Sequence, residues 1–266
     1  MKNLEGIDFV NLKSIPLKSL EKMHLWDSSN YLDLQLMYNF NLFFPKSGPI
    51  LSHGPELNGI YFFNEQFKET DHTAYLIYQL DFRNRSTLLF FLSDDYVELL
   101  SPFDPSGLQI SQLQTGTRHN WNAFGWNYQS KPQSLFTYAF EGRLGGYYAD
   151  GNRTSLTGEM GYRFQPYVSL KANLNYNHIE LPDPWKTNDF WLIGAEADIT
   201  FTNKLFFANL LQYNEQSNNF NINSRFQWRY SPASDLFIVY TNNYFVDPFE
   251  GRNWGLTLKF TYWLNN

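Results

Sequence analysis

The residues best suited to chemistry are charged side chains that recur at every second position of strand-like segments. Between Phe220 and Tyr230, for example, arginines at 225 and 229 alternate with aromatic residues. Side chains two residues apart lie on the same face of a strand, so we expect these charges to gather on one face of a sheet. The predicted set is Asp81, Arg83, Glu141, Arg143, Glu159, Arg163, Lys171, Glu196, Asp198, Arg225, Arg229 and Lys259.

Two roles suit such a charged face. It could line an aqueous pore and set the preference of that pore for ions or solutes. Alternatively, opposite charges could pair across strands and brace the interior, because a buried charge needs a partner. The signs are nearly balanced, which favours bracing. Glu196 and Asp198 have the spacing of any polar strand face, so we do not interpret them as an acid/base pair and predict no catalytic residue.

Histidine offers the catalytic alternative, a membrane-embedded lipase or glycan hydrolase. A lipase of this kind needs a serine, a histidine and a polar third group on neighbouring strands, yet neither His119 nor His178 is followed by a serine two residues later. None of the five histidines belongs to an HExxH motif or to a His/acid pair with metal-ligand spacing. We therefore predict no metal site, no cofactor and no enzymatic activity.

The elements that would position these charges are amphipathic strands. Apolar residues alternate with Asp33, Gln35, Asn39 and Asn41 between Tyr31 and Phe44, which is typical of a strand with two different faces. The segments 87–100, 204–215 and 234–245 are apolar on both faces in places, which predicts packing inside a barrel. We expect strands at 31–44, 57–67, 73–84, 87–100, 118–129, 134–147, 153–165, 167–180, 189–201, 204–215, 220–230, 234–245 and 253–264.

Composition favours a membrane protein. Aromatic residues make up 19% of the chain and charged residues only 17%, as expected for an outer-membrane barrel with aromatic girdles. No apolar run approaches the roughly 18 residues of a membrane helix. The net charge of −6 argues against a nucleic-acid partner. The residues predicted to face lipid include Phe226, Trp228, Tyr230, Trp254, Phe260 and Tyr262.

From residue 83 onward, the expected connections alternate between short and long. Tight turns at one end and longer loops at the other are typical of a bacterial outer-membrane barrel. We thus predict an all-β, antiparallel, up-and-down transmembrane barrel over 31–266, with a periplasmic C-terminus. About thirteen strands are visible, so we expect an incomplete barrel of 14–16 strands. A soluble β-sandwich binding protein is the alternative.

Residues 1–30 are weakly patterned and are interpreted as a lead-in or a partial strand. Within them, 7–12 could form a short strand and 17–25 one or two helical turns. Because strand numbers in these barrels are even, either a strand is missing or residues 1–30 supply it. The start of the chain has no apolar signal-peptide core. We therefore expect that Met1 is not the native start or that the sequence belongs to a longer precursor.

The C-terminal half resembles a known family through GYRFQPYVSLKANLNYNHIELPDPW (161–185), NINSRFQWRYSPASDLFIVYTNNYF (221–245) and NWGLTLKFTYWLNN (253–266). These stretches are similar to the C-terminal barrel of the domain-of-unknown-function family 5916 of Bacteroidota outer membranes, and the resemblance covers roughly 45–266. Relatives typically carry an N-terminal carbohydrate-binding family 9-like module. The quoted sequence contains no such module, so a sugar-binding or hydrolase label does not transfer to its residues.

The expected function is a pore, or a membrane anchor for a periplasmic glycan-binding module. The expected partners are outer-membrane lipid, the barrel-assembly machinery and glycan bound through a module outside this chain.

Overall fold

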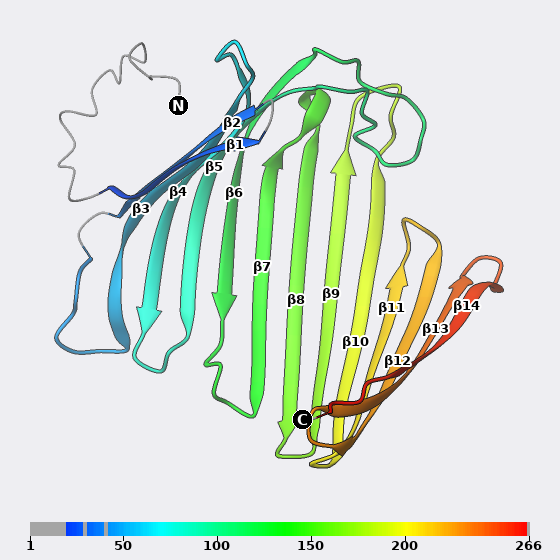
Figure 1. Cartoon of the computed structure of the whole chain (residues 1–266). Helices are drawn as coiled ribbons and strands as arrows, with labels where there is room; N and C mark the ends of the chain where they lie inside the picture. Colours follow the sequence, from blue (N-terminus) through cyan, green and yellow to red (C-terminus); the bar gives the residue numbers. More distant parts are fainter. Residues whose placement is uncertain (1–19, 29–30, 40–41, 265–266) are drawn as a thin grey trace.

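The computed structural model describes residues 20–28, 31–39 and 42–264, which form one antiparallel sheet of 14 strands (Figure 1). Each strand pairs with its neighbours in sequence, without crossovers. The strands are β1 (Leu20–Ser28), β2 (Tyr31–Asn39), β3 (Ile50–Phe63), β4 (Glu69–Phe82), β5 (Thr87–Glu98), β6 (Arg118–Gln129), β7 (Phe136–Gly146), β8 (Asn152–Phe164), β9 (Val168–Glu180), β10 (Asn188–Thr202), β11 (Leu205–Asn214), β12 (Asn219–Ser231), β13 (Ser234–Phe245) and β14 (Glu250–Phe260).

A single turn of 3-10 helix, η3 (Tyr148–Asp150), connects β7 to β8. No helix in the described part of the chain is long and apolar enough to cross a membrane.

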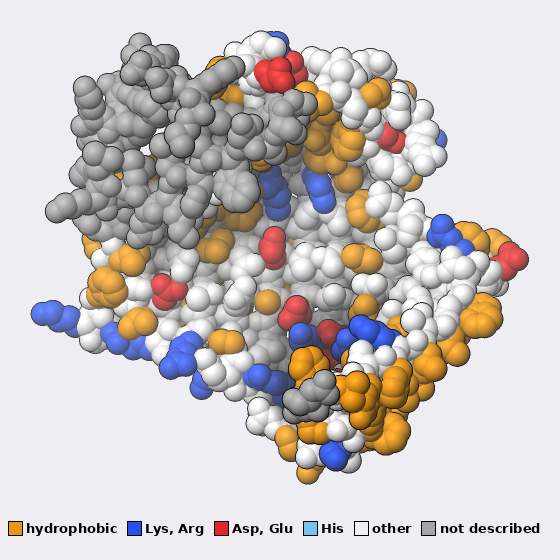
Figure 2. Space-filling model, viewed as in Figure 1, with side chains coloured by type: hydrophobic (Ala, Val, Ile, Leu, Met, Phe, Trp, Pro, Cys, Tyr) orange, Lys and Arg blue, Asp and Glu red, His pale blue; other side chains and the backbone are white. Residues whose placement is uncertain are grey.

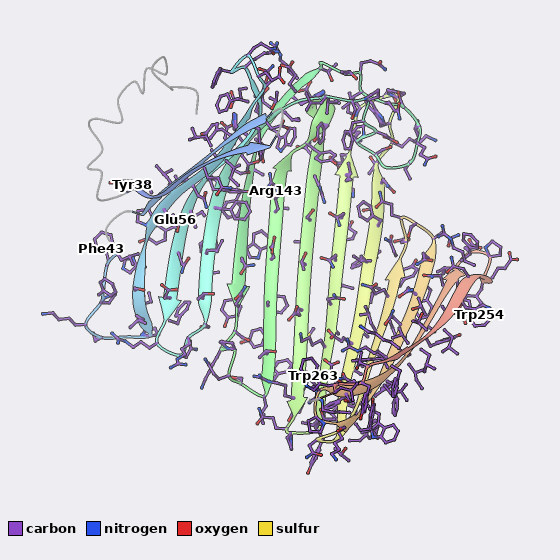
Figure 3. All side chains as sticks on the ribbon, in the orientation of Figure 1. Tyr38, Phe43, Glu56, Arg143, Trp254 and Trp263 are labelled. Atoms are coloured by element: carbon purple, nitrogen blue, oxygen red, sulfur yellow. The ribbon has the colours of Figure 1, made fainter. Side chains whose placement is uncertain are left out.

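The sheet curls into a trough whose two edges are β1 and β14 (Figure 1). The concave face is identified by Arg143 of β7, whose Nη2 lies 2.5 Å from Asp95 Oδ2 of β5 across the intervening strand β6. Figure 3 shows Arg143 beside the hollow and Trp254 on the outer side of β14. Because facing residues of paired strands share a side, the register assigns the residues of β3 to β14 to the concave or the convex face.

Apolar side chains dominate the convex face and are widely exposed. The exposed fraction is 47% for Leu76, 55% for Leu92 and 68% for Leu258. Nearly complete burial of an apolar side chain is rare among the described residues and is reached by Leu99, Ala123, Ile179 and Trp185. A β-sandwich would bury one face of each of two sheets, whereas the described residues form one sheet with an exposed apolar face.

The connections sort by end, as expected. Odd-numbered strands run toward one end, the loop end, where 99–117 and 181–187 connect strands. Even-numbered strands run toward the turn end, where the links after residue 82 are short, as at 203–204 and 232–233. The link at 40–49 is an exception to this sorting. β14 ends at the turn end, where β1 also begins.

The additional strand that an even strand count requires lies within residues 1–30. Leu20–Ser28 forms β1, which pairs antiparallel with β2 and brings the count to 14. The prediction of helical turns over 17–25 is therefore wrong for its described residues 20–25. The short strand expected at 7–12 lies outside the described residues.

Several predicted strand limits differ from the structure, among them the start of β4, which is Glu69 instead of residue 73. The first predicted strand, 31–44, ends at Asn39. The segment 45–56 was expected to be a connection because it is rich in proline and glycine, but β3 starts at Ile50. Pro55 lies next to the last described pair of the ladder with β2, Asn39–Glu56, and a proline is best tolerated at such an edge of the pairing. The last strand ends at Phe260, so Tyr262 follows the strand instead of lying on it.

Two glycines offer a matched test of packing. A Cβ at Gly125 on the concave face would overlap the Phe91 ring and lie 2.5 Å from the Gly142 carbonyl oxygen, whereas a Cβ at Gly158 would meet only Phe140 at 3.8 Å. We expect Gly125→Ala to lower the free energy of unfolding by about 1–3 kcal/mol and Gly158→Ala to leave it nearly unchanged. Urea unfolding in detergent micelles measures both, and equal losses would contradict the packing at β6.

Candidate functional site on the concave face

The structure gathers the predicted charged residues on the concave face, with one exception. A row of directly paired residues runs from Asp81 through Thr87, Gln129, Ala139, Glu159 and Asn173. The other predicted charges on the strands share the side of this row. Arg83 is the exception because it lies in the turn after β4. Figure 2 shows acidic and basic side chains within the hollow.

The ion pair between Asp95 and Arg143 is the most enclosed on this face. The exposed fraction is only 10% for the Asp95 side chain and 29% for the Arg143 side chain. Thr73 Oγ1 and Ser93 Oγ also donate to the Asp95 carboxylate, at 3.2 and 2.8 Å. The small residue Ala123 on β6 leaves room for the arginine to reach over that strand. This pair fits the bracing interpretation, in which a buried charge is balanced by a partner.

Other guanidinium groups on or near this face donate hydrogen bonds to backbone carbonyl oxygens of turns and connections. Arg163 Nη2 donates to the carbonyl oxygens of Pro132 and Ser134, each at 2.6 Å. Arg83 similarly donates to Gly48 O and Pro45 O, which attaches the 83–86 turn to the 40–49 connection. Carbonyl oxygens are acceptors that a charged donor bonds strongly. These arginines therefore order the turn end instead of neutralising acidic residues.

Bracing does not account for every charge. Arg229 does have a bracing partner, because its Nε lies 3.4 Å from Asp235 Oδ1. Lys171 and Glu196, by contrast, are directly paired across β9 and β10 but form no ion pair with each other or with another described side chain. Their charged ends face the hollow, as the pore-lining interpretation requires.

The predicted lipid-facing aromatic residues Phe226, Trp228, Tyr230, Trp254 and Phe260 lie on the convex face, by register. The exposed fraction is 47% for Trp228, 72% for Trp254 and 64% for Phe260. Tyr230 stacks on Phe260 with ring centroids 5.3 Å apart. Tyr262, beyond β14, is 62% exposed.

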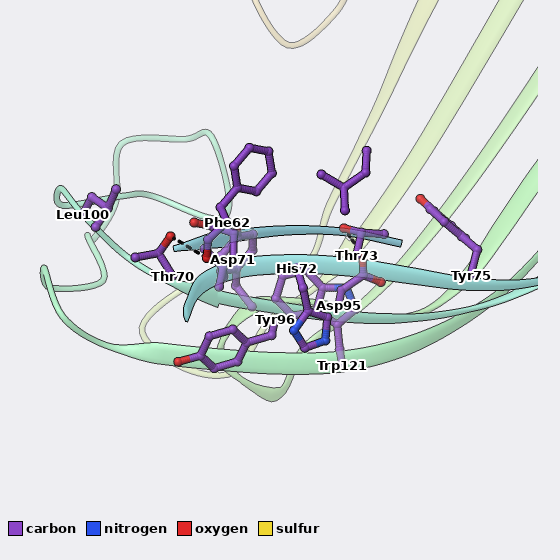
Figure 4. Close-up of a pocket in the computed structure, with 13 residues that line it drawn as sticks. Phe62, Thr70, Asp71, His72, Thr73, Tyr75, Asp95, Tyr96, Leu100 and Trp121 are labelled. Atoms are coloured by element: carbon purple, nitrogen blue, oxygen red, sulfur yellow. Dashed lines mark hydrogen bonds between the residues drawn. The ribbon is translucent and has the colours of Figure 1, made fainter. Parts of the chain in front are cut away.

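A cavity of about 580 Å³ lies at the loop end, between β3, β4, β5 and β6 (Figure 4). Aromatic side chains line much of it, including Phe62, Tyr75, Trp121 and Tyr148, and Asp71 and Asp95 add carboxylates. Sequence reasoning missed this cavity. Its only signal was the apolar character of both faces of 87–100, where the inward-facing Phe91 makes an edge contact with Tyr75 at a centroid distance of 5.5 Å.

Tyr148 of η3 closes part of this cavity from the loop end. Its ring lies 4.8 Å from both the Trp121 ring and the Phe103 ring. Burial raises the pKa of the Tyr148 phenol, and the neighbouring Tyr147 and two acidic residues raise it further. The phenol is therefore neutral at ordinary pH and forms an uncharged part of the cavity wall.

The longest loop, 99–117, is folded rather than extended. Trp185 Nε1 donates to Ser111 O at 2.8 Å, which ties this loop to 181–187. Within the loop, Asp104 accepts from the backbone N–H groups of Ser106 and Gln109 at 2.9 and 2.6 Å and from Ser106 Oγ at 2.7 Å. Partial burial raises the pKa of Asp104, but these hydrogen bonds outweigh burial, so the pKa of its carboxyl lies below the usual range. The loop thus depends on the ionised carboxylate.

The two histidines considered for catalysis have other partners. His119 Nδ1 accepts from Ala149 N at 3.3 Å, so Nε2 carries the proton of the neutral ring and faces Thr117 Oγ1 at 3.1 Å as a donor. His178 contacts Asp189 and Glu180 through its two nitrogens. Neither ring is hydrogen-bonded to a serine hydroxyl within the described part of the chain. The hydrolase alternative gains no support from this geometry.

No group of three or more His, Asp or Glu residues in the described ranges is arranged to hold a metal ion. Comparison with known proteins returned no match to a protein-family model, to a curated protein or to a solved structure. The resemblance to family 5916 therefore stays a prediction.

Charge balance at Asp95 can be tested by substitution. Arg143→Met leaves a poorly exposed carboxylate without its counter-charge, and we expect the free energy of unfolding to fall by about 1.5–3 kcal/mol. Adding Asp95→Asn to this variant removes the charge and should restore most of the loss. Urea unfolding in micelles measures each variant.

The control for this test is Arg118→Met, because the Arg118–Glu98 pair has a 59% exposed arginine and its loss is expected to leave the free energy of unfolding nearly unchanged. If the single and double variants at 143 and 95 lose equal stability, the carboxylate does not depend on Arg143.

Loop 99–117 should depend on pH through Asp104. A lowered pKa in the folded state stabilises the loop above the unfolded value of about 3.9, and this contribution is lost as the pH falls through the folded pKa. At neutral pH we expect Asp104→Ala to raise the rate of proteolytic cleavage in the loop several-fold. Asp104→Asn, which keeps one acceptor oxygen, should be intermediate. Below that folded pKa, pepsin should cleave wild type and Asp104→Ala at similar rates. A difference that persists there would contradict the role of the carboxylate.

Proposed function

We propose that this protein is a non-enzymatic outer-membrane β-barrel that closes by pairing β1 with β14, and that its concave face lines a water-filled pore. The observation that carries the proposal is the two-faced sheet. Its convex side chains are apolar and exposed, as for Leu92 and Leu258, whereas charges and amides lie on the concave face. Exposed apolar surface on this scale marks a surface that contacts lipid or another protein.

Closure follows from the bilayer environment. Lipid offers no hydrogen-bond partner to backbone groups, so an open sheet edge is not stable within it. The even strand count makes β1 and β14 antiparallel, which is the direction that pairing across the gap requires. Barrels of 8 strands are filled by side chains, and those of 16–18 strands leave an aqueous channel. A 14-stranded barrel lies near the upper part of this range.

Orientation is proposed from the connections. Short turns of bacterial barrels are periplasmic, and long loops are extracellular. The turn end, with the end of β14, would therefore face the periplasm, and loop 99–117 would lie outside. A glycan-binding module joined before β1 would be periplasmic, so an anchoring role is the second candidate. The resemblance to family 5916 favours this candidate.

The decisive experiment uses the full-length protein extracted from membranes. We expect extraction to need detergent and the folded form to migrate differently from the heated form on a gel. In planar bilayers, stepwise single-channel conductance supports the pore. Heat-dependent mobility without conductance would favour the anchoring role over the pore. Extraction without detergent would contradict the membrane barrel altogether.

A further inference from the structure

Amide side chains predominate on the loop-end half of the concave face between β9 and β13, where Phe190, Leu192 and Leu210 also face inward. Along residues 168–245, all of which the structure describes, the inward-facing positions of this half carry no charge, whereas Lys171, Glu196 and Arg225 lie closer to the turn end of their strands. We define the amide wall as Asn173, Asn175, Asn177, Asn221, Asn223 and Asn243.

Hydrogen bonds across the strands orient these amides. Asn221 Nδ2 donates to Asn243 Oδ1 at 2.8 Å, and Asn223 Nδ2 donates to Thr241 Oγ1 at 3.1 Å. On β9, Asn175 Oδ1 accepts from Thr157 Oγ1 at 2.7 Å. A primary amide has two N–H donors and two acceptor lone pairs. Each of these bonds uses only part of that capacity, so the wall keeps donors and acceptors for a solute.

The carbonyl oxygen of one neighbouring amide has no hydrogen-bond partner within the described structure. Asn219 Oδ1, on the same face of β12, is buried and accepts no hydrogen bond within the described structure. Leaving a buried acceptor unsatisfied costs about 1–3 kcal/mol.

We infer that the pore, if the proposed function holds, favours uncharged, hydroxyl-rich solutes the size of small sugars over ions. A hydroxyl group both donates and accepts, so the amide wall can replace the hydrogen bonds that such a solute makes with water. A cation at the same position finds no opposite charge in the wall. An anion finds only Arg153 of β8, whose Nη2 is already hydrogen-bonded to Asn177 Oδ1 at 2.7 Å, so either ion loses hydration without full compensation. The mixed charges nearer the turn end add no strong preference for either sign, because the two signs are nearly balanced.

The test measures solute entry into phosphatidylcholine vesicles that contain the full-length protein. Glucose, gluconate and glucosamine have similar size and carry no charge, a negative charge and a positive charge. We expect glucose to enter several times faster than either charged solute. If none enters and no conductance is seen, the pore itself fails. If the charged solutes enter as fast as glucose, the pore stands and the inference about its solute is overturned.

A matched pair of variants locates the selectivity. Asn175→Asp keeps the acceptor for Thr157 Oγ1. Asn223→Asp replaces the amide donor to Thr241 Oγ1 with an acceptor, to which the rotatable Thr241 hydroxyl can donate. Together the two changes add two negative charges to the wall. We expect faster glucosamine entry and slower gluconate entry, with heat-dependent mobility on a gel confirming the fold. Asn152→Asp makes the same change at an exposed position on the convex face at the start of β8, and we expect no effect. Equal effects from both sets of substitutions would overturn the role of the amide wall.

Discussion

A single hydrogen-bonded ladder, carried from β1 to β14 without crossover, is the constraint on which the rest of the structure depends. Because strand side chains alternate faces, a slip of one residue at any pairing would turn every apolar residue of that strand to the concave face. The register irregularities lie near strand ends, as at Leu20/Lys22, Thr200/Thr202 and Arg229/Ser231. Alternation is therefore continuous across the middle of the sheet.

Within this ladder, the concave face is organised by small residues as much as by charged ones. Ala123 has a small side chain and Gly125 has none, which leaves space on the concave side of β6. Arg143 reaches Asp95 through this space, and the Phe91 ring lies over Gly125. Charge and packing are thus coupled on β5, β6 and β7. Between β9 and β13, the loop-end half of the face instead carries amide and hydroxyl side chains that form hydrogen bonds with one another without charged partners on these strands.

The loop end forms a second ordered layer above the sheet. Loop 99–117 is held internally by Asp104 and externally through the indole of Trp185, while Tyr148 packs between Phe103 and Trp121. These contacts join segments far apart in sequence and order the loops at this end. Under the proposed function, the loop layer would lie at the extracellular mouth.

The sequence by itself determined the strands, the two faces and the end at which the long loops lie, because period-two alternation and turn residues are local signals. FNINSRFQWRY shows this most clearly, since it lies within β12 with its arginines on the concave face. Local signals were misleading at Pro55, a proline that lies inside β3 next to the last described pair of its ladder with β2. They were weak over 20–28, where pairing with β2 decides the strand.

Only the tertiary structure decided which charges meet. The ion pair between Asp95 and Arg143 spans two strand separations, and the cavity beside Trp121 combines four strands with η3. Neither follows from residue spacing, because both depend on sheet curvature and on how loops fold back. The alternation of side chains along a strand determines the face on which each one lies. Only the curvature of the complete sheet brings residues of non-adjacent strands within bonding distance.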